Sequence, residues 1–310
     1  GDKMLTEEEF YKESIDANLY YLRTLRDFCI NIELSFYGNN PYKARAEALA
    51  RRSQDLGREI VTLTNGKVPS KGVNYQIFYT EYTLPIERLT EKLFNLNLGT
   101  DITEMQLNLT PTDTFDINDE LIRTMTSIND RASNIANDFI ELARVIRDEM
   151  TSNNLFSYSY PTMYNFMIIT IELYIGELNR LKERIRKDPI IALDTEYGYN
   201  ITAYEITSFL RGLIDPNATS YIEVLNNILN EIYPQLLEDY NSLPLSPENQ
   251  QNLTERSIAV IRRIGLLIRD MLRDLLDAKL YFIIEPLAID NFYRNINYFL
   301  YVLDADSKEV

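Results

Sequence analysis

Apolar residues recur at steps of three and four along most of this 310-residue chain, the spacing of helices that bury one face. The segment 121–146 is the most regular, because its steps alternate between four and three throughout. Its stripe consists of Leu121, Met125, Ile128, Ala132, Ile135, Phe139, Leu142 and Ile146. This pattern predicts a helix packed nearly parallel to its neighbours, as in a helical bundle.

Caps, prolines and turn residues divide the other stripes into further helices. Thr6 and Glu9 form a capping box that predicts the start of the first helix, and Pro41 is placed to open the second. Later helices are expected near 83–96, 161–185, 199–214, 225–236, 261–275 and 287–303. Strand signals are few, and only the segment 73–83 competes with this all-helical prediction.

The two halves of the chain resemble each other locally. The segment from Pro161, PTMYNFMIITIELYI, can be laid on the segment from Pro286, PLAIDNFYRNINYFL. Both open with proline and carry a polar residue one turn later. We therefore predict two tandem up-down four-helix bundles, at 1–190 and 191–310, with an irregular insertion at 67–115 in the first.

Charge and composition exclude several classes of function. The 47 acidic and 31 basic side chains give a net charge of -16, which disfavours binding to nucleic acid or to an anionic membrane surface. The chain has one cysteine, Cys29, and neither a membrane-spanning apolar run nor a signal-peptide pattern at its start. We accordingly expect a soluble, cytoplasmic protein.

The chain contains no histidine, which removes Ser-His and Cys-His catalytic pairs and every histidine-ligated metal site. Phosphate-binding glycine loops are also missing from the sequence. No cofactor is implied. A metal site built only from carboxylates stays open, although we expect these side chains to lie on solvated or half-buried faces. The candidates are Glu33, Glu87, Glu172, Glu205 and Asp290.

Tyrosine is abundant, with 22 residues against no tryptophan. Such residues commonly bury their rings and leave their hydroxyls in water. The alternative is an assembly surface, since tyrosine is enriched at protein interfaces. A homo-oligomer or an unidentified protein partner is therefore possible.

Four segments, spread over both halves, resemble one bacterial family. They are ESIDANLYYLRTLRDF near the start, YTLPIERLT at 82–90, SFLRGLIDP at 208–216 and EPLAIDNFYRNINYFLYVL at 285–303. The family is a duplicated, ferritin-like helical family of unknown function found in endospore-forming bacteria. The resemblance implies that both predicted bundles are ferritin-like.

The resemblance also assigns metal-ligand positions, and this chain departs from the family at most of them. Histidines and carboxylates of the family fall on residues of other types here, while Glu205, Asp290 and Arg294 are kept. The altered positions are Ala17, Asn18, Phe28, Asn165, Phe166, Ile169, Thr170, Ile206, Asn291, Asn295 and Tyr298. The resemblance thus supports the fold while the ligands are replaced.

These observations favour a non-catalytic, metal-free structural or interaction protein, in which side chains fill the space of a lost metal site. One alternative is a small-molecule binding protein, with the buried amides Asn165, Asn291 and Asn295 and the hydroxyl of Tyr298 lining a pocket in a bundle core. Weaker alternatives are a carboxylate-only metal protein and an enzyme that uses carboxylates and tyrosines.

Overall fold

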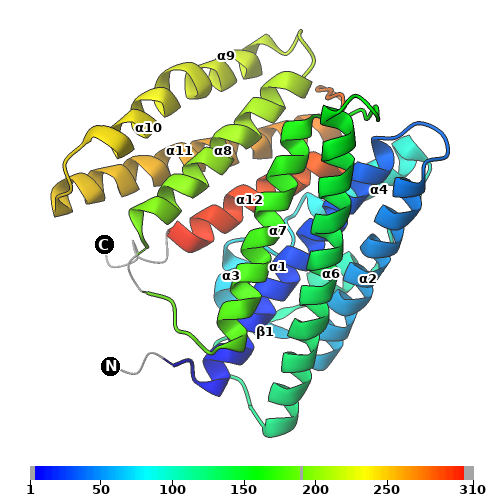
Figure 1. Cartoon of the computed structure of the whole chain (residues 1–310), viewed down its shortest axis with the longest axis vertical. Helices are drawn as coiled ribbons and strands as arrows, with labels where there is room; N and C mark the ends of the chain where they lie inside the picture. The colour runs from blue at the N-terminus through cyan, green and yellow to red at the C-terminus, as the bar shows by residue number, and fades with distance from the viewer. Residues whose placement is uncertain (1–3, 189–190, 304–310) are drawn as a thin grey trace. The chain divides into compact units, whose positions relative to one another are not determined.

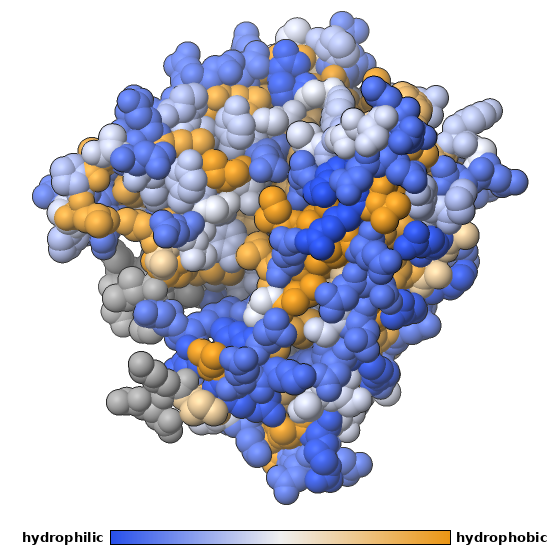
Figure 2. Space-filling view, in the orientation of Figure 1, coloured by the Kyte–Doolittle hydropathy of each residue, from blue (hydrophilic) through white to orange (hydrophobic). Residues whose placement is uncertain are grey.

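Helices make up most of the computed structural model, which describes residues 4–188 and 191–303 (Figure 1). This confirms the all-helical prediction. Contacts within the chain define two compact units: the first unit is Gly1–Asn74 with Gly99–Lys187, and the second unit is Tyr75–Leu98 with Asp188–Val310. The face of the molecule in Figure 2 is mostly hydrophilic, with apolar side chains scattered across it.

Four long helices form the frame of the first unit. They are α1 (Glu7–Leu34), α2 (Pro41–Leu63), α6 (Asp119–Thr151) and α7 (Pro161–Lys182). Helix α1 packs on α2 and α7, and α6 also packs on both α2 and α7, so the four helices enclose a common core. The stripe predicted for 121–146 lies buried on α6, except for Leu121, which is half-buried at the start of that helix.

Short elements complete the first unit between its second and third long helices. They are β1 (Lys67–Pro69), α3 (Ser70–Asn74), α5 (Asp101–Leu107) and β2 (Thr110–Thr112). The two strands pair in parallel, with Lys67 opposite Thr110. The segment 73–83, which competed as a strand in the sequence, instead runs from α3 through turns into a helix.

The second unit is built from α4 (Thr83–Phe94), α8 (Leu193–Leu213), α11 (Pro247–Leu276), α12 (Pro286–Leu303) and one interrupted helix. The interrupted helix is predicted as a single element and consists of α9 (Thr219–Asn227), η1 (Ile228–Ile232) and α10 (Tyr233–Ser242). Its middle part widens into a π-turn just before Pro234. Because proline has no N–H and its ring clashes with the preceding turn, a regular ladder cannot continue there.

Helix α4 belongs to the second unit, although the sequence places it within the insertion of the first bundle. It packs on α12 and α11, and Leu287 donates its backbone N–H to Thr90 Oγ1 at 3.1 Å. The predicted helix at 83–96 is confirmed by Thr83–Phe94. The division at residue 190 stays a prediction, since contacts group residues 75–98 with the C-terminal half.

Two helices are buried along most of their length and carry the candidate site. Helix α1 is buried continuously over residues 14–32, and α12 over residues 286–299. Amphipathic surface helices bury only a stripe, so both helices are core elements. The capping box of Thr6 and Glu9 fixes the start of α1, as predicted.

Candidate functional site

A neutral hydrogen-bonded cluster lies in the core of the first unit. Asn18 of α1 is fully buried and donates from Nδ2 to Asn129 Oδ1 of α6 at 2.7 Å. Tyr174 of α7 donates its hydroxyl to Asn18 Oδ1, and Asn129 donates to Ser14 Oγ at 3.1 Å. Burial holds the pKa of Tyr174 well above its usual range, so the phenol stays a donor. The cluster joins α1, α6 and α7 without a charged group.

Aromatic rings fill the core at two positions that the resemblance assigns to metal ligands. Phe28 of α1 meets Phe166 of α7 edge to face, with ring centroids 5.8 Å apart, and Phe139 of α6 at 6.0 Å. Thr170 donates a hydrogen bond from its hydroxyl to the Phe166 carbonyl at 2.8 Å. Phe28 and Phe166 are both buried, so this part of the bundle is packed with hydrocarbon.

Asn165 differs from its expected place inside the bundle, because it is exposed. Arg147 of α6 donates to Asn165 Oδ1 at 2.9 Å on the outer surface. Pro161 starts α7 in a phase that turns Asn165 outward, together with Ile169 one turn later. The structure therefore does not bring Asn165 together with Asn18 and Phe28.

A fully buried ion pair lies on α12 in the second unit. Asp290 and Arg294, two of the three positions that keep the residue expected from the resemblance, form an ion pair at 3.1 Å and have no exposed side-chain surface. Thr80 and Thr83, at the start of α4, donate their hydroxyls to the same carboxylate at 3.1 and 3.0 Å. The carboxylate therefore fastens α4 to α12, with its charge balanced by arginine.

The other expected positions on α12 are occupied by mutual contacts. Asn295 donates to Asn291 Oδ1 at 3.0 Å, and both amides are buried. Tyr298 stacks on Tyr301 with ring centroids 5.7 Å apart. The two asparagines therefore share a hydrogen bond and the two tyrosine rings pack on each other, all within α12.

On α8, Ile206 is fully buried, whereas the neighbouring Glu205 is only half-buried. Burial raises the pKa of Glu205. Adjacent residues on a helix point about 100° apart, so only one of the two can lie at the centre. Here the apolar residue takes that place.

A second buried cluster, around Glu196 of α8, was not found from the sequence. Tyr240 of α10 and Thr254 of α11 donate their hydroxyls to its carboxylate, the latter at 2.8 Å. Ser257 also contacts Tyr240 Oη at 2.7 Å and accepts from Asn200 at 2.8 Å. Burial raises the pKa of Glu196, and the two hydroxyl donors partly oppose that rise.

Comparing residue spacings in the two halves of the sequence would have pointed to Glu196. Glu196 precedes Ile206 by the same number of residues as Asn18 precedes Phe28. Asn18 bonds to Asn129 on α6, and Glu196 bonds to Thr254 at the corresponding place on α11. In each unit a buried polar side chain ten residues before Phe28 or Ile206 thus forms a hydrogen bond to another helix.

Acidic and sulfur side chains do not gather into a metal-binding cluster in the part of the chain that the structure describes. Among residues 4–188 and 191–303, no group of three or more His, Cys, Asp or Glu is placed to hold an ion. Cys29 is buried, and its burial raises the pKa of the thiol well above the usual value. Glu172 is exposed and pairs with Arg144 at 2.6 Å.

The fold and these clusters define a class: an all-helical protein whose core holds packing residues, hydrogen-bonded amides and hydroxyls, and buried ion pairs such as Asp290 with Arg294 and Asp27 with Arg26. No helix among the described residues is long and apolar enough to span a membrane. No family model matches the chain.

Comparison with known proteins gives two similarities. The chain is 22% identical over 303 residues, 97% of its length and 99% of the relative's, to spore coat protein CotB of Clostridioides difficile (strain 630). Its structure is similar to the crystal structure of an uncharacterized protein from Bacillus cereus G9241, with a TM-score of 0.64 and 12% identity. That match covers 96% of this chain and 92% of the other. The structural match shows the fold alone, while the relative fits the resemblance to a family of endospore-forming bacteria.

Proposed function

We propose that this chain is a non-catalytic, metal-free structural protein that assembles with other proteins in a spore coat. One observation carries the metal-free part: three positions that the resemblance assigns to metal ligands hold the buried apolar residues Phe28, Phe166 and Ile206. The relative named as a spore coat protein, similar over nearly the whole of both chains, supports the structural role and the location.

The hydrogen bonds within the core support this proposal over its alternatives. Asn295 donates to Asn291, and Asn18 both donates to Asn129 and accepts from Tyr174, so the amides at these expected site positions have protein partners. Asp290 is paired with Arg294, and a cation next to that guanidinium is disfavoured.

Metal content tests the metal-free part. The chain is produced in medium rich in iron and manganese, dialysed, and measured by inductively coupled plasma mass spectrometry. We expect far less than one ion per chain. One ion per chain that survives dialysis and is lost in Asp290→Asn would overturn this part of the proposal.

An uncharged aromatic end of the first unit supports assembly. We define the aromatic end as Tyr37, Phe156 and Tyr158, which are 92, 73 and 70% exposed. Tyr158 donates its N–H to the Ser35 carbonyl at 2.7 Å, so the loop after α1 and the loop before α7 lie side by side. Neither loop, at 35–41 or 152–160, contains a charged residue.

The charge of the chain explains why such an end suits assembly. With a net charge of -16, most approaches between copies are repulsive. Exposed aromatic side chains on an uncharged surface offer apolar contact area without that cost. The aromatic end is therefore the part of the first unit that we expect a protein partner to cover.

A triple variant tests assembly: Tyr37→Ser, Phe156→Ser and Tyr158→Ser. The control replaces exposed apolar residues on the side of α7, Ile169→Ser and Leu173→Ser. We expect the wild type and the control to be detected in coat extracts of spores from the encoding bacterium, and the triple variant to be depleted. Equal recovery of all three chains would contradict a role for the aromatic end. Absence of the wild type from the coat would contradict the proposed location.

A further inference from the structure

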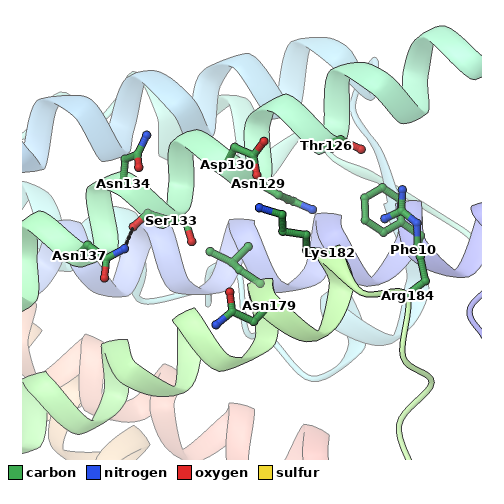
Figure 3. A pocket seen from close by; sticks show the side chains of 11 residues that line it. Phe10, Thr126, Asn129, Asp130, Ser133, Asn134, Asn137, Asn179, Lys182 and Arg184 are labelled. Carbon is green, nitrogen blue, oxygen red and sulfur yellow. Dashed lines mark hydrogen bonds between the residues drawn. The ribbon is translucent and has the colours of Figure 1, made fainter.

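A polar groove runs between α6 and α7 of the first unit, where α1 begins (Figure 3). Its volume is about 330 Å³, which is the lower end of the range for small-molecule sites. None of the residues singled out from the sequence lines it. The groove is separate from the aromatic end, because its walls come from the opposite ends of α6 and α7.

The floor of the groove is held rigid by the core. Asn129, which is 6% exposed, lines the groove and also forms hydrogen bonds to Ser14 and Asn18 in the core beneath it. An amide has two donor hydrogens and two acceptor lone pairs, so these two bonds leave one of each. A fixed amide with spare capacity is a preorganised contact for a polar ligand.

Amides continue along both walls. Asn134 on α6 and Asn179 on α7 make no side-chain hydrogen bond to any residue that the structure describes. Asn137 donates to the Ser133 carbonyl at 3.0 Å, which fixes the far end of the groove (Figure 3). The lining therefore offers donors and acceptors on two sides.

Two cations line the groove without an ion-pair partner among the described residues. Lys182 reaches from α7 toward Asp130 and Asn129, and neither Lys182 nor Arg184 forms a salt bridge within the described residues (Figure 3). Basic side chains close by are paired: Arg180 with Glu13 and Glu177, Arg186 with Glu9, and Lys187 with Glu177. In the part of the chain that the structure describes, Lys182 and Arg184 thus have no acidic partner that would compete with an anionic ligand in this groove.

Arg184 is also partly desolvated. Its guanidinium carbon lies 3.2 Å from the centre of the Phe10 ring, and burial lowers the pKa of this arginine. A cation that has lost part of its water gains more from an anionic partner than an exposed one. On the opposite wall, Asp130 is an exposed carboxylate with no basic partner among the described residues.

We propose that this groove binds a small zwitterion, a free amino acid or a short peptide with free ends. Lys182 and Arg184 receive its carboxylate, and Asp130 receives its ammonium group. The amides of Asn129, Asn134 and Asn179 bond to the polar atoms between these charges. This site is independent of the proposed coat function.

Isothermal titration calorimetry on the whole chain tests the proposal with three probes: the dipeptide Ala-Ala, free alanine, and N-acetyl-Ala-Ala-amide. The capped dipeptide keeps the shape and lacks both charges. We expect saturable binding of Ala-Ala or alanine and at least about tenfold weaker binding of the capped probe, the loss of charge-assisted hydrogen bonds. Tighter binding of Ala-Ala would identify the ligand as a short peptide, and tighter binding of alanine would identify it as a free amino acid.

Two variants and a control assign the binding to this groove. Lys182→Gln and Asp130→Asn, both at exposed positions, should each weaken binding by about tenfold. Lys92→Gln on α4, an exposed lysine with no bonded partner among the described residues, should leave it unchanged. Melting curves verify that each variant folds. Equal binding of capped and uncapped dipeptides, no saturable binding at millimolar concentration, or unchanged binding in both groove variants would overturn the proposal.

Discussion

Asp290 and Glu196, two of the buried carboxylates of the second unit, are stabilised by different partners. Asp290 has a guanidinium at 3.1 Å, whereas Glu196 has only hydroxyl donors from Tyr240 and Thr254. Burying a charge without a counter-charge costs free energy, so burial favours the neutral, protonated form of Glu196. Glu196 is therefore the residue at which we expect pH to act on the fold.

Glu196→Gln should make the chain more stable at neutral pH. Because burial raises the folded-state pKa of Glu196 above its unfolded value, the folded chain holds this proton more tightly. Stability is fully present below the unfolded pKa and falls as pH rises through the folded pKa. Glutamine stays neutral and can still accept a hydroxyl bond, so the variant should lose this fall.

Thermal melts between about pH 4, near the unfolded pKa of glutamate, and pH 8 measure the effect. The melting temperatures of variant and wild type should converge at the acid end and separate toward neutrality. Glu238→Gln, an exposed glutamate on α10, is the control and should follow the wild type. A variant that is less stable than the wild type throughout this range would contradict the argument.

At the residue scale, the sequence located core positions better than it located contacts. Met125, Phe139 and Ile146 are buried as their stripe predicts. Asn165 is not, because a residue at the edge of a stripe can face in or out depending on the phase in which its helix starts. The cluster at Glu196 was missed because Tyr240 and Thr254 lie on other helices, and no local pattern pairs them.

At the scale of elements, glycines on two helices meet different surroundings. A Cβ added at Gly176 of α7 would have no heavy atom within 4 Å, whereas one at Gly265 of α11 would lie 3.2 Å from Ile296 of α12. Gly176 thus lowers the stability of α7 although no neighbouring atom requires a glycine there. Gly265, in contrast, allows α11 and α12 to approach closely.

Gly176→Ala should raise the unfolding free energy by about 0.5–1 kcal/mol, the difference in helix propensity. Gly265→Leu should lower it by about 1–3 kcal/mol, because the larger side chain overpacks the contact with α12. Urea unfolding followed by circular dichroism measures both changes. Opposite signs for the two substitutions are expected, and a loss of stability in Gly176→Ala would contradict the reading of α7.

Helix positions were predictable, and helix partners were not. The alternation of four and three placed α6, and the cap at Thr6 placed α1. The apolar stripe of α4 predicted where the helix lies in the sequence but not to which unit it belongs. An amphipathic face shows that a helix needs an apolar partner, but it does not identify that partner. The π-turn in the α9–α10 helix shifts the phase by a residue, which a fixed period misses.

At the scale of the whole molecule, charge opposes the assembly that aromatic side chains favour. The chain carries -16 at neutral pH and has an isoelectric point near 4.6. Repulsion between copies is screened by salt, with a Debye length of about 10 Å at 0.1 M and about 3 Å at 1 M. Apolar contact is not weakened by this screening.

The mean mass of the purified chain in sedimentation experiments should therefore increase between low salt and about 1 M sodium chloride. The triple serine variant of the aromatic end should increase less than the wild type. A wild-type mass that falls as salt is added would show that ion pairs, rather than apolar contacts, hold copies together.

The place of α4 also sets an order on folding during synthesis. Thr90 leaves the ribosome long before Leu287, its hydrogen-bond partner 197 residues later. The second unit can finish only when a segment made early joins helices made last, and pairings so distant in sequence form slowly. A gene cut between the two halves would give a C-terminal fragment in which Asp290 has lost the hydroxyls of Thr80 and Thr83. Synthesis of both halves as one chain therefore supplies the Thr80 and Thr83 hydroxyls to Asp290.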